Sequence, residues 1–512
     1  MTSQTWGACG ERSRTKRSRN NWIYRVFVSR YRWLSVLAAL ILCSILAVGM
    51  GYLLAEFGPL VAGAGMAGLF LGLWMLRDIE VAYYSVIGIV CLLPFASFPF
   101  SIGFRPTLLD AALGALFLNW LLQLAGGHQR EFVATPLGLP IIVFMLLAVG
   151  SFIFGLAHVP LTLGFLQYYI RHFGEVMLSV GLFFVIVNTV RDEHRLRSIV
   201  RALILGASGA AVLGIALYII ADQISPDFVV RALSALGRVG YPTGSGVLRY
   251  IRDDPELPMR ATSTSVDPNV LGSLLNVALA ISLPQLFSER PLSRHRYLVP
   301  MLGIMAVCLG LTMSRGSMVG LGAALLVIST LRYRKLWIPL AGALAIVILL
   351  PQVRGLLVHF LEGFRAQDLA TQMRMGEYRD ALILIRRYPL LGVGFAGSPD
   401  IDTYIGVANV YLLIAQQMGL IGLTSFLVVV IVLLARFWRT RKLVVGTALE
   451  PLWWGLHAGI IGALVGGIFD HYFFNLDFHH SVTLFWLIVG LATAATELIR
   501  TQAATQRISS PG

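Results

Sequence analysis

The amino-acid sequence predicts an all-α, polytopic integral membrane protein. Hydrophobic residues make up 57% of its 512 residues and charged residues only 13%, whereas a soluble domain carries about a quarter charged residues. The apolar residues are grouped into runs of about 18 to 25, the length of helix that crosses the hydrocarbon core of a bilayer. The alternating segments of an outer-membrane barrel are absent from the sequence, so we expect every span to be a helix.

We predict fourteen transmembrane helices with both termini in the cytoplasm. Four short connections are dense in Arg and Lys, and the positive-inside rule places them in the cytoplasm: residues 191–201, 290–296, 332–335 and 436–442. The connections between them then face outward. Because both termini lie in the cytoplasm, the number of spans is even. The predicted spans are residues 33–54, 58–76, 80–100, 107–125, 136–157, 173–190, 199–221, 266–287, 297–313, 316–331, 336–353, 408–435, 451–469 and 481–499.

Two long loops on the outward face divide the predicted helices into three groups. Long ordered loops usually carry function, so we place the active face there. Along the chain we expect a basic cytoplasmic tail, N-terminal helices, a first large loop, central helices, a second large loop, C-terminal helices and a cytoplasmic tail, with the boundaries 1–32, 33–221, 222–265, 266–353, 354–407, 408–499 and 500–512.

Charge and cysteine usage exclude several function classes. The formal net charge is +14, but the arginines are separated by apolar segments, so anionic lipid headgroups explain them better than nucleic acid does. No pair of cysteines is placed for a disulfide or a metal site, and no divalent-metal cluster is visible. We therefore expect no metal and no cofactor. The cysteines are Cys9, Cys43, Cys91 and Cys308.

The second loop contains a predicted helix from Thr371 to Arg387. The apolar face of this helix includes Tyr378. Arg374 lies one turn before Tyr378 on the same face, so this arginine should face the membrane domain. Glu377 is one turn from Arg374 and is a candidate general base. Arg379 lies on another side of the helix, where we expect solvent, and is kept as a substrate-binding candidate. After the helix, Gly392-Val-Gly394 favours a plain turn over a phosphate-binding loop.

Arg315 lies between two apolar segments with almost no loop around it. An arginine at the membrane face is costly unless it snorkels, forms an ion pair or lines a wet cavity. One interpretation is a snorkelling residue at a tight turn. The other, which we favour, is an anion-binding group in the turn Ser314-Arg315-Gly316, facing a cavity under the second loop.

These residues also carry a family resemblance. The chain resembles the O-antigen ligase/polymerase superfamily of bacterial envelope glycosyltransferases over about residues 220 to 490. The matching segments, in order, run from Arg260 to Asn269, from Thr312 to Ser317, from Arg374 to Gly394, from Asn409 to Leu412 and from Gln417 to Gly422.

The resemblance implies a substrate and a site. Members act on polyprenyl-diphosphate-linked oligosaccharides at the outer face of the inner membrane, and the leaving group is a lipid diphosphate. Arg315 and Arg374 would stabilise that diphosphate through bidentate contacts. Glu377 and His471 are the remaining catalytic candidates, and the substrate-binding candidates are Arg260, Ser314, Arg379, Asn409 and Tyr411.

One departure from the family pattern decides between two activities. Many members place a His directly before the Asn of the later motif, and ligases are thought to depend on it, whereas this chain has Ala408. We therefore predict a polymerase that transfers glycan onto the next lipid-linked repeat unit. Its partners would be a lipid-linked oligosaccharide of the undecaprenyl diphosphate type and membrane lipids, with a chain-length regulator protein as a further candidate.

Three alternatives stay open. A ligase would transfer the glycan to a lipid or protein acceptor. A small-anion transporter, of the bicarbonate type, would use the arginines in transit, but the sequence shows no internal repeat of the kind that transporters carry. A structural membrane protein would not require an arginine on the apolar stripe of the loop-two helix.

Overall fold

The computed structural model describes residues 32–101, 104–127, 132–157, 163–251, 254–255, 257–338, 340–342, 369–395, 403 and 406–509. The chain divides into two units, Met1–Trp74 and Met75–Gly512. The predicted N-terminal tail, residues 1–31, lies outside the described residues, as do 343–368, which contain most of the predicted span 336–353.

Helix α3 (Arg32–Arg77) accounts for the described part of the first unit. It covers both of the first two predicted spans, and Gly58 separates them with φ 81° and ψ 175°, directly before Pro59. Only glycine adopts that backbone conformation readily, and Pro59 lacks the N–H that a continuous helix would use. The boundary predicted between the two spans therefore coincides with a real break.

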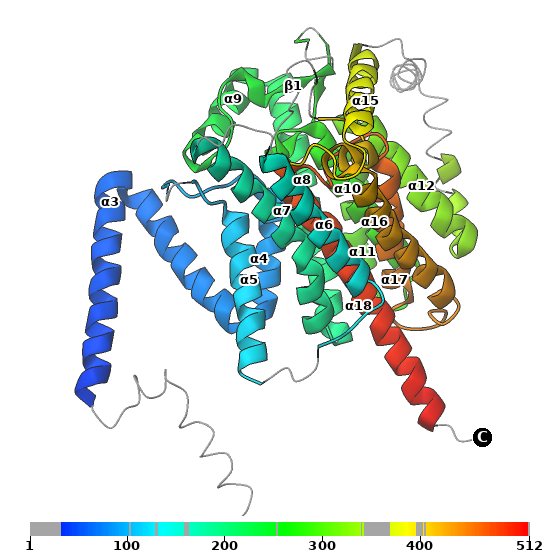
Figure 1. The fold of residues 1–512 in the computed structure, drawn as a ribbon, viewed down its shortest axis with the longest axis horizontal. Coiled ribbons are helices and arrows are strands. Elements are labelled where there is room, and N and C mark those ends of the chain that lie inside the picture. The colour runs from blue at the N-terminus through cyan, green and yellow to red at the C-terminus, as the bar shows by residue number, and fades with distance from the viewer. Residues whose placement is uncertain are drawn as a thin grey trace, which may run out of the picture. The chain divides into compact units, whose positions relative to one another are not determined.

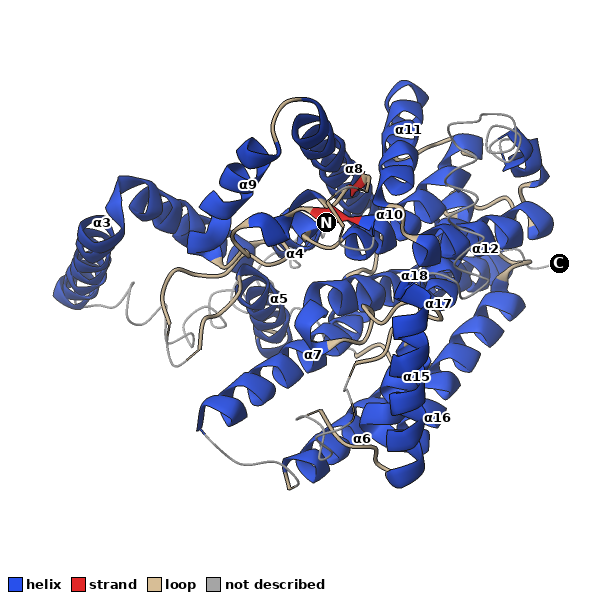
Figure 2. Ribbon diagram, turned by 90° about the horizontal axis from the view of Figure 1, so that it is seen from above, coloured by secondary structure: helices blue, strands red, loops and turns tan. Residues whose placement is uncertain are grey.

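The second unit is built from helices that pack side by side (Figure 1). Helix α12 packs on α17, α7 on α18, α10 on α17, α4 on α8 and α6 on α16. Figure 2 shows almost every described segment as helix. The long helices of this unit are α4 (Ile79–Leu92), α5 (Leu108–Ala125), α6 (Gly138–Leu156), α7 (Leu163–Thr189), α8 (Glu193–Gln223), α10 (Pro268–Ser282), α11 (His295–Thr312), α12 (Arg315–Leu331), α16 (Val410–Thr440), α17 (Glu450–Gly466) and α18 (His479–Ser509).

Eight helices of the described residues are long and apolar enough to cross a membrane, and three further apolar helices are shorter. The all-helical, multi-pass class is therefore confirmed, while the number of spans and the orientation of the termini stay predictions. Two of the eight are the most deeply buried: the windows in Pro268–Phe287 and Leu476–Gln506 are 83% and 89% buried. These two segments form the centre of the second unit.

Several predicted boundaries differ from the structure, and two of the differences have a clear physical cause. Helix α4 ends at Leu92 and not near residue 100, because Pro94 and Pro99 disfavour helix over the residues before them. Helix α7 begins at Leu163, ten residues before the predicted span. Arg171 pairs with Glu175 one turn later, at 2.7 Å, so the polar residues that interrupt the apolar run continue the helix.

The first long loop is ordered over most of its length. Helix α9 (Pro226–Ser234) begins at the Ser225 cap. The two strands pair antiparallel, with Arg249 opposite Arg260. The remaining elements are η1 (Ala235–Val239), η2 (Ser245–Val247), β1 (Arg249–Tyr250), β2 (Met259–Arg260) and η4 (Ser263–Ser265).

The described part of the second loop is helix α15 (Leu369–Arg387), which ends where the sequence predicts, before Tyr388-Pro389. Figure 1 shows α9, β1 and α15 at the same end of the bundle, opposite the C-terminal end of α18. We call this the loop end.

Candidate functional site

The candidate site lies at the loop end, where the N-termini of α10, α12 and α16 meet the turn 467–478. The backbone N–H of Ala261 donates to Leu311, which ties the first loop to the end of α11, and the N–H of Val410 donates to the carbonyls of Gly467 and Asp470. Segments that are far apart in sequence are therefore joined through their backbones. They bring together three arginines, Arg260, Arg315 and Arg374, which we call the arginine cluster.

Arg260 is held in place by hydrogen bonds from two of its nitrogens. Its Nε donates to the Thr312 carbonyl at 2.9 Å, and Nη2 donates to Asn269 Oδ1 at 2.7 Å. Burial lowers the pKa of the guanidinium, Asp267 and Asp470 oppose that shift, and the charge of Arg315 adds to it. A side chain fixed in this way suits the supporting role predicted for Arg260, because a guanidinium has five N–H donors and these two bonds use only part of them.

Arg315 is the first residue of α12, and the turn before it is tightly built. Met313 adopts a left-handed conformation with φ 50°, and Ser314 is buried, with its hydroxyl donating to Ser317 at 2.9 Å. Gly316 allows a close approach: an added Cβ would lie 2.9 Å from the Phe469 Cβ and 3.5 Å from Asp470 Oδ2. The Ser-Arg-Gly turn therefore packs at Gly316 against the segment that carries Asp470, and Arg315 begins α12 at this contact.

Helix α15 turns Arg374 toward the same place. Arg374, Glu377 and Tyr378 are half-buried, whereas Arg379 is exposed. The charge of Arg374 lowers the pKa of Asp470 against a larger rise caused by burial. Glu377 Oε2 accepts a hydrogen bond from the Ala408 N–H at 3.0 Å. Arg374 thus faces the membrane domain, as the apolar stripe predicts, and Arg379 stands apart from the arginine cluster.

Asp470 is a buried carboxylate, and sequence reasoning did not single it out. It is 7% exposed and lies four residues after the end of α17. Burial raises its pKa to about 7, Arg374 and Arg260 oppose the rise, and Asp267 and Glu377 contribute to it. A carboxylate with a pKa near neutral can exchange a proton under ordinary conditions.

Burial shifts the pKa of His471 in the opposite direction from that of Asp470. Burial lowers its pKa to about 4, although Asp267 partly opposes the shift. Its ring lies 4.8 Å from that of Tyr472, whose own pKa is raised by burial and whose hydroxyl bonds to Asn269 and Asp267. A histidine with so low a pKa is neutral at pH 7 and accepts a proton weakly, so its environment does not favour His471 as the general base.

Asn409 and Tyr411 are occupied by structural contacts. Asn409 caps α16: its Oδ1 accepts from the N–H groups of Tyr411 and Leu412, and its Nδ2 donates to the Ile468 carbonyl at 2.9 Å. The Tyr411 hydroxyl donates to the Leu464 carbonyl at 2.9 Å. These contacts use the polar atoms that a substrate would need, so they favour a scaffold role for both residues.

The segment after α15 is a structural turn. Val393 and Gly394 donate their N–H groups to the carbonyls of Gln416 and Gln417, each at 2.9 Å, at the point where α16 breaks at Gly419. Gly394 has φ 80°, and an added Cβ would lie 2.5 Å from the Gly155 Cα. The N–H groups of Val393 and Gly394 are already bonded to backbone carbonyls, so they favour a plain turn over a phosphate-binding loop.

A second group of polar side chains lies apart from the arginine cluster. Among the described residues, Asp110, Glu175 and His479 have ligand atoms within 4.8 Å of one another. No metal cluster is predicted from the sequence. These residues belong to three helices that are far apart in the chain, so their spacing cannot show their proximity.

The buried carboxylate of Asp470 lies within reach of the charges of Arg374 and Arg260, and the charge of Arg315 in turn reaches Arg260. Such an arrangement binds an anionic leaving group and stabilises the charge that develops on it. The family comparison points the same way: residues 300–427 match a family model described as O-Antigen ligase. The matched segment contains Arg315, Arg374 and Glu377. The comparison with curated proteins found no match.

Proposed function

We propose that this member of the O-antigen ligase/polymerase superfamily is a polysaccharide polymerase of the periplasmic face of the bacterial inner membrane. Members of the family are glycosyltransferase-like enzymes that act on lipid-linked glycans. The observation that carries the proposal is the buried carboxylate of Asp470 within reach of the charges of Arg374 and Arg260 at the loop end, with Arg315 close enough to influence Arg260.

In the proposed reaction, a hydroxyl of the next lipid-linked repeat unit attacks C1 of the donor sugar. The bond between C1 and the diphosphate oxygen breaks, and its electron pair leaves on the polyprenyl diphosphate. Arg315 and Arg374 would stabilise the leaving diphosphate, and Arg260, fixed by Thr312 and Asn269, would support them. No divalent metal is assigned to this step.

The proton of the attacking hydroxyl needs an acceptor. Asp470 suits this role better than the candidates named from sequence, because burial raises its pKa to about 7 and a general base works best with a pKa near the operating pH. Glu377 would act by holding Ala408 and the adjoining cap at Asn409. Asp470 would therefore be the base, and Glu377 a positioning residue.

A ligase is the second candidate, because the matched family model is itself described as O-Antigen ligase. The two activities share a donor and differ in the acceptor. A deletion strain distinguishes them: a missing polymerase leaves lipid-linked single repeats, whereas a missing ligase leaves lipid-linked long polymer. We expect single repeats, and long polymer would contradict the polymerase proposal.

Reconstitution tests the chemistry directly. Purified protein in proteoliposomes, given a lipid-linked oligosaccharide, should lengthen the glycan and release free polyprenyl diphosphate. Uptake of bicarbonate by the same vesicles, without glycan turnover, would instead support a transporter and overturn the proposed function.

A further inference from the structure

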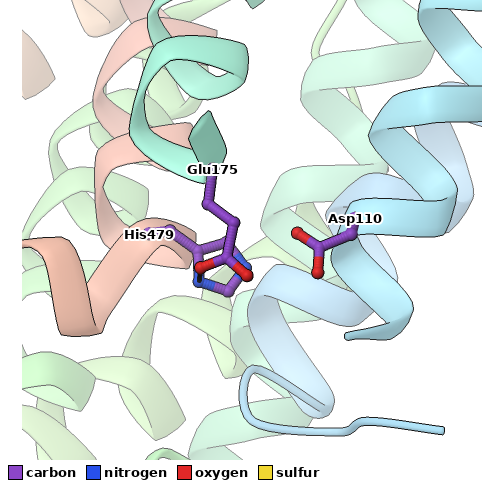
Figure 3. A group of neighbouring side chains, drawn as sticks. All are labelled: Asp110, Glu175 and His479. Carbon is purple, nitrogen blue, oxygen red and sulfur yellow. Dashed lines mark ion pairs between the residues drawn. The ribbon is translucent and has the colours of Figure 1, made fainter. Parts of the chain in front are cut away.

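The group formed by Asp110, Glu175 and His479 brings three helices together near the loop end. Asp110 is in the first turn of α5, Glu175 is in α7 and His479 begins α18. Their ligand atoms all lie within 4.8 Å of one another, and Figure 3 shows the three side chains directed into the space between the helices. We call this group the acid–histidine cluster.

The two oxygens of each carboxylate have different surroundings. Asp110 Oδ2 accepts from the Thr107 N–H at 2.8 Å and lies 4.0 Å from Arg171 Nη2, and Glu175 Oε1 accepts from Arg171 Nε at 2.7 Å. Of the other oxygens, Asp110 Oδ1 is buried with no hydrogen-bond partner among the described residues, and Glu175 Oε2 is buried and faces the rings of His172 and His479. Carboxylates that bind metals show this division, with one oxygen turned toward the ion and the other held by an outer donor.

Two histidines complete the cluster. His479 is 5% exposed, and its Nε2 is buried with no hydrogen-bond partner in the described part of the chain. Its Nδ1 lies 3.6 Å from Glu175 Oε2, and His172 Nδ1 lies 3.0 Å from the same oxygen. Buried polar groups without partners are costly, so four side chains converge on one place where a ligand would satisfy them.

The local charge balance favours a cation. Asp110 and Glu175 carry two negative charges, and Arg171 carries one positive charge. One negative charge therefore remains at this place, and a bound cation would offset it. Buried charges persist only when they are paired or coordinate a metal.

We propose that Asp110, Glu175 and His479 bind one divalent transition-metal ion, with His172 beside Glu175. Two carboxylate oxygens and imidazole nitrogen are donors that Zn²⁺ and Mn²⁺ accept. The ion would fasten α5 and α7 to the first turn of α18, next to the turn that carries Asp470. This site is separate from the proposed glycosyl transfer and does not depend on it.

The test measures metal binding and not activity. Full-length protein without a polyhistidine tag is purified in detergent, stripped with EDTA and equilibrated with Zn²⁺ alone. We expect one equivalent of bound Zn²⁺ and a rise in melting temperature. The variants Asp110→Asn, Glu175→Gln and His479→Gln should each weaken binding by at least about tenfold. Asn and Gln keep an oxygen for the Thr107 N–H and for Arg171, so the surrounding contacts are retained.

Zn²⁺ binding is also measured for two control variants. Asp254→Asn and His295→Gln change exposed side chains outside the cluster and should bind Zn²⁺ as the unchanged protein does. If a cluster variant fails to fold, X-ray absorption of the Zn²⁺-loaded protein decides, because imidazole and oxygen neighbours are expected. Folded protein that binds no stoichiometric Zn²⁺, or sulfur neighbours, would overturn the proposal and leave a proton shared by Glu175 and His479.

Discussion

The carboxylate of Glu377 accepts a hydrogen bond from the backbone N–H of Ala408 at 3.0 Å. Ala408 stands directly before Asn409, at the position where the resemblance leads one to expect a histidine in ligases. In this chain a carboxylate from α15 therefore approaches the same point of the backbone. Because Asn409 caps α16, the contact also ties the second loop to the start of that helix.

Glu377 substitutions separate a positioning role from a catalytic one. Glu377→Gln keeps an oxygen that accepts from Ala408, while Glu377→Ala removes it. Since hydrogen bonds to a charged acceptor are about twice as strong as neutral ones, Glu377→Gln should keep part of the rate of glycan transfer and Glu377→Ala should lose most of it. Equal loss in both, measured in proteoliposomes, would show that the charge itself is required and would make Glu377 the base.

Arg374 and Arg379 form a matched pair on one helix. Arg374 is half-buried beside Asp470, whereas Arg379 is exposed. Arg374→Ala should reduce glycan transfer by about 10²-fold or more, as loss of a transition-state donor does, and Arg374→Lys should recover little, because lysine lacks the planar fork. Arg379→Ala should leave the rate within about twofold by the same reasoning. A larger effect at Arg379 would move the anion site to the outer side of α15.

Sequence reasoning succeeded where the signal is local. The span of α15, its end before Pro389 and the inward side of Arg374 follow from helical periodicity and proline stereochemistry. The burial of Asp470 was not predicted, because a carboxylate that follows an apolar run in the sequence looks like any polar turn residue. The acid–histidine cluster was also missed, since its members come from α5, α7 and α18 and no spacing in the sequence joins them.

The orientation of the loop end can be tested with reporter fusions. A periplasmic reporter fused after Arg387, at the end of α15, should be active, and one fused after Lys335 should be inactive, because the positive-inside rule places Lys335 in the cytoplasm. A fusion after Arg441 should match the one after Lys335. The reverse pattern would place the arginine cluster on the cytoplasmic face and remove the basis for a periplasmic reaction.

Asp470 should give glycan transfer a pH dependence. Burial raises its pKa to about 7, and the charged groups that influence it are Arg374, Asp267, Arg260 and Glu377. The carboxylate accepts a proton only when ionised, so the rate should rise with pH to a plateau above about pH 7. Asp470→Asn should abolish this dependence together with most of the rate. An unchanged pH profile in that variant would exclude Asp470 as the base.

Asp470 should also make the stability of the folded protein depend on pH, with stability falling where the rate of glycan transfer rises. The folded pKa of Asp470 lies above the ordinary aspartate pKa of 3.8, so between these two values the folded state holds a proton that the unfolded state has lost. Stability from this group is therefore complete below about pH 4 and falls as the pH rises toward 7. Melting temperatures should show that Asp470→Asn lacks this decline, and a decline of equal size would assign it to other groups.

Gly316 and Gly322 offer a paired test of the close contact that places Arg315. Both are in α12, but an added Cβ at Gly316 would lie 2.9 Å from the Phe469 Cβ, whereas at Gly322 it would meet nothing within 4 Å. Gly316→Ala should destabilise the protein by about 1–3 kcal/mol through overpacking, shift the start of α12 that carries Arg315 and slow glycan transfer. Gly322→Ala should be neutral or stabilising by up to about 1 kcal/mol, because alanine favours helix. Melting temperatures and transfer rates of the two variants measure both effects, and similar values for both would mean that α12 does not need this contact to present Arg315.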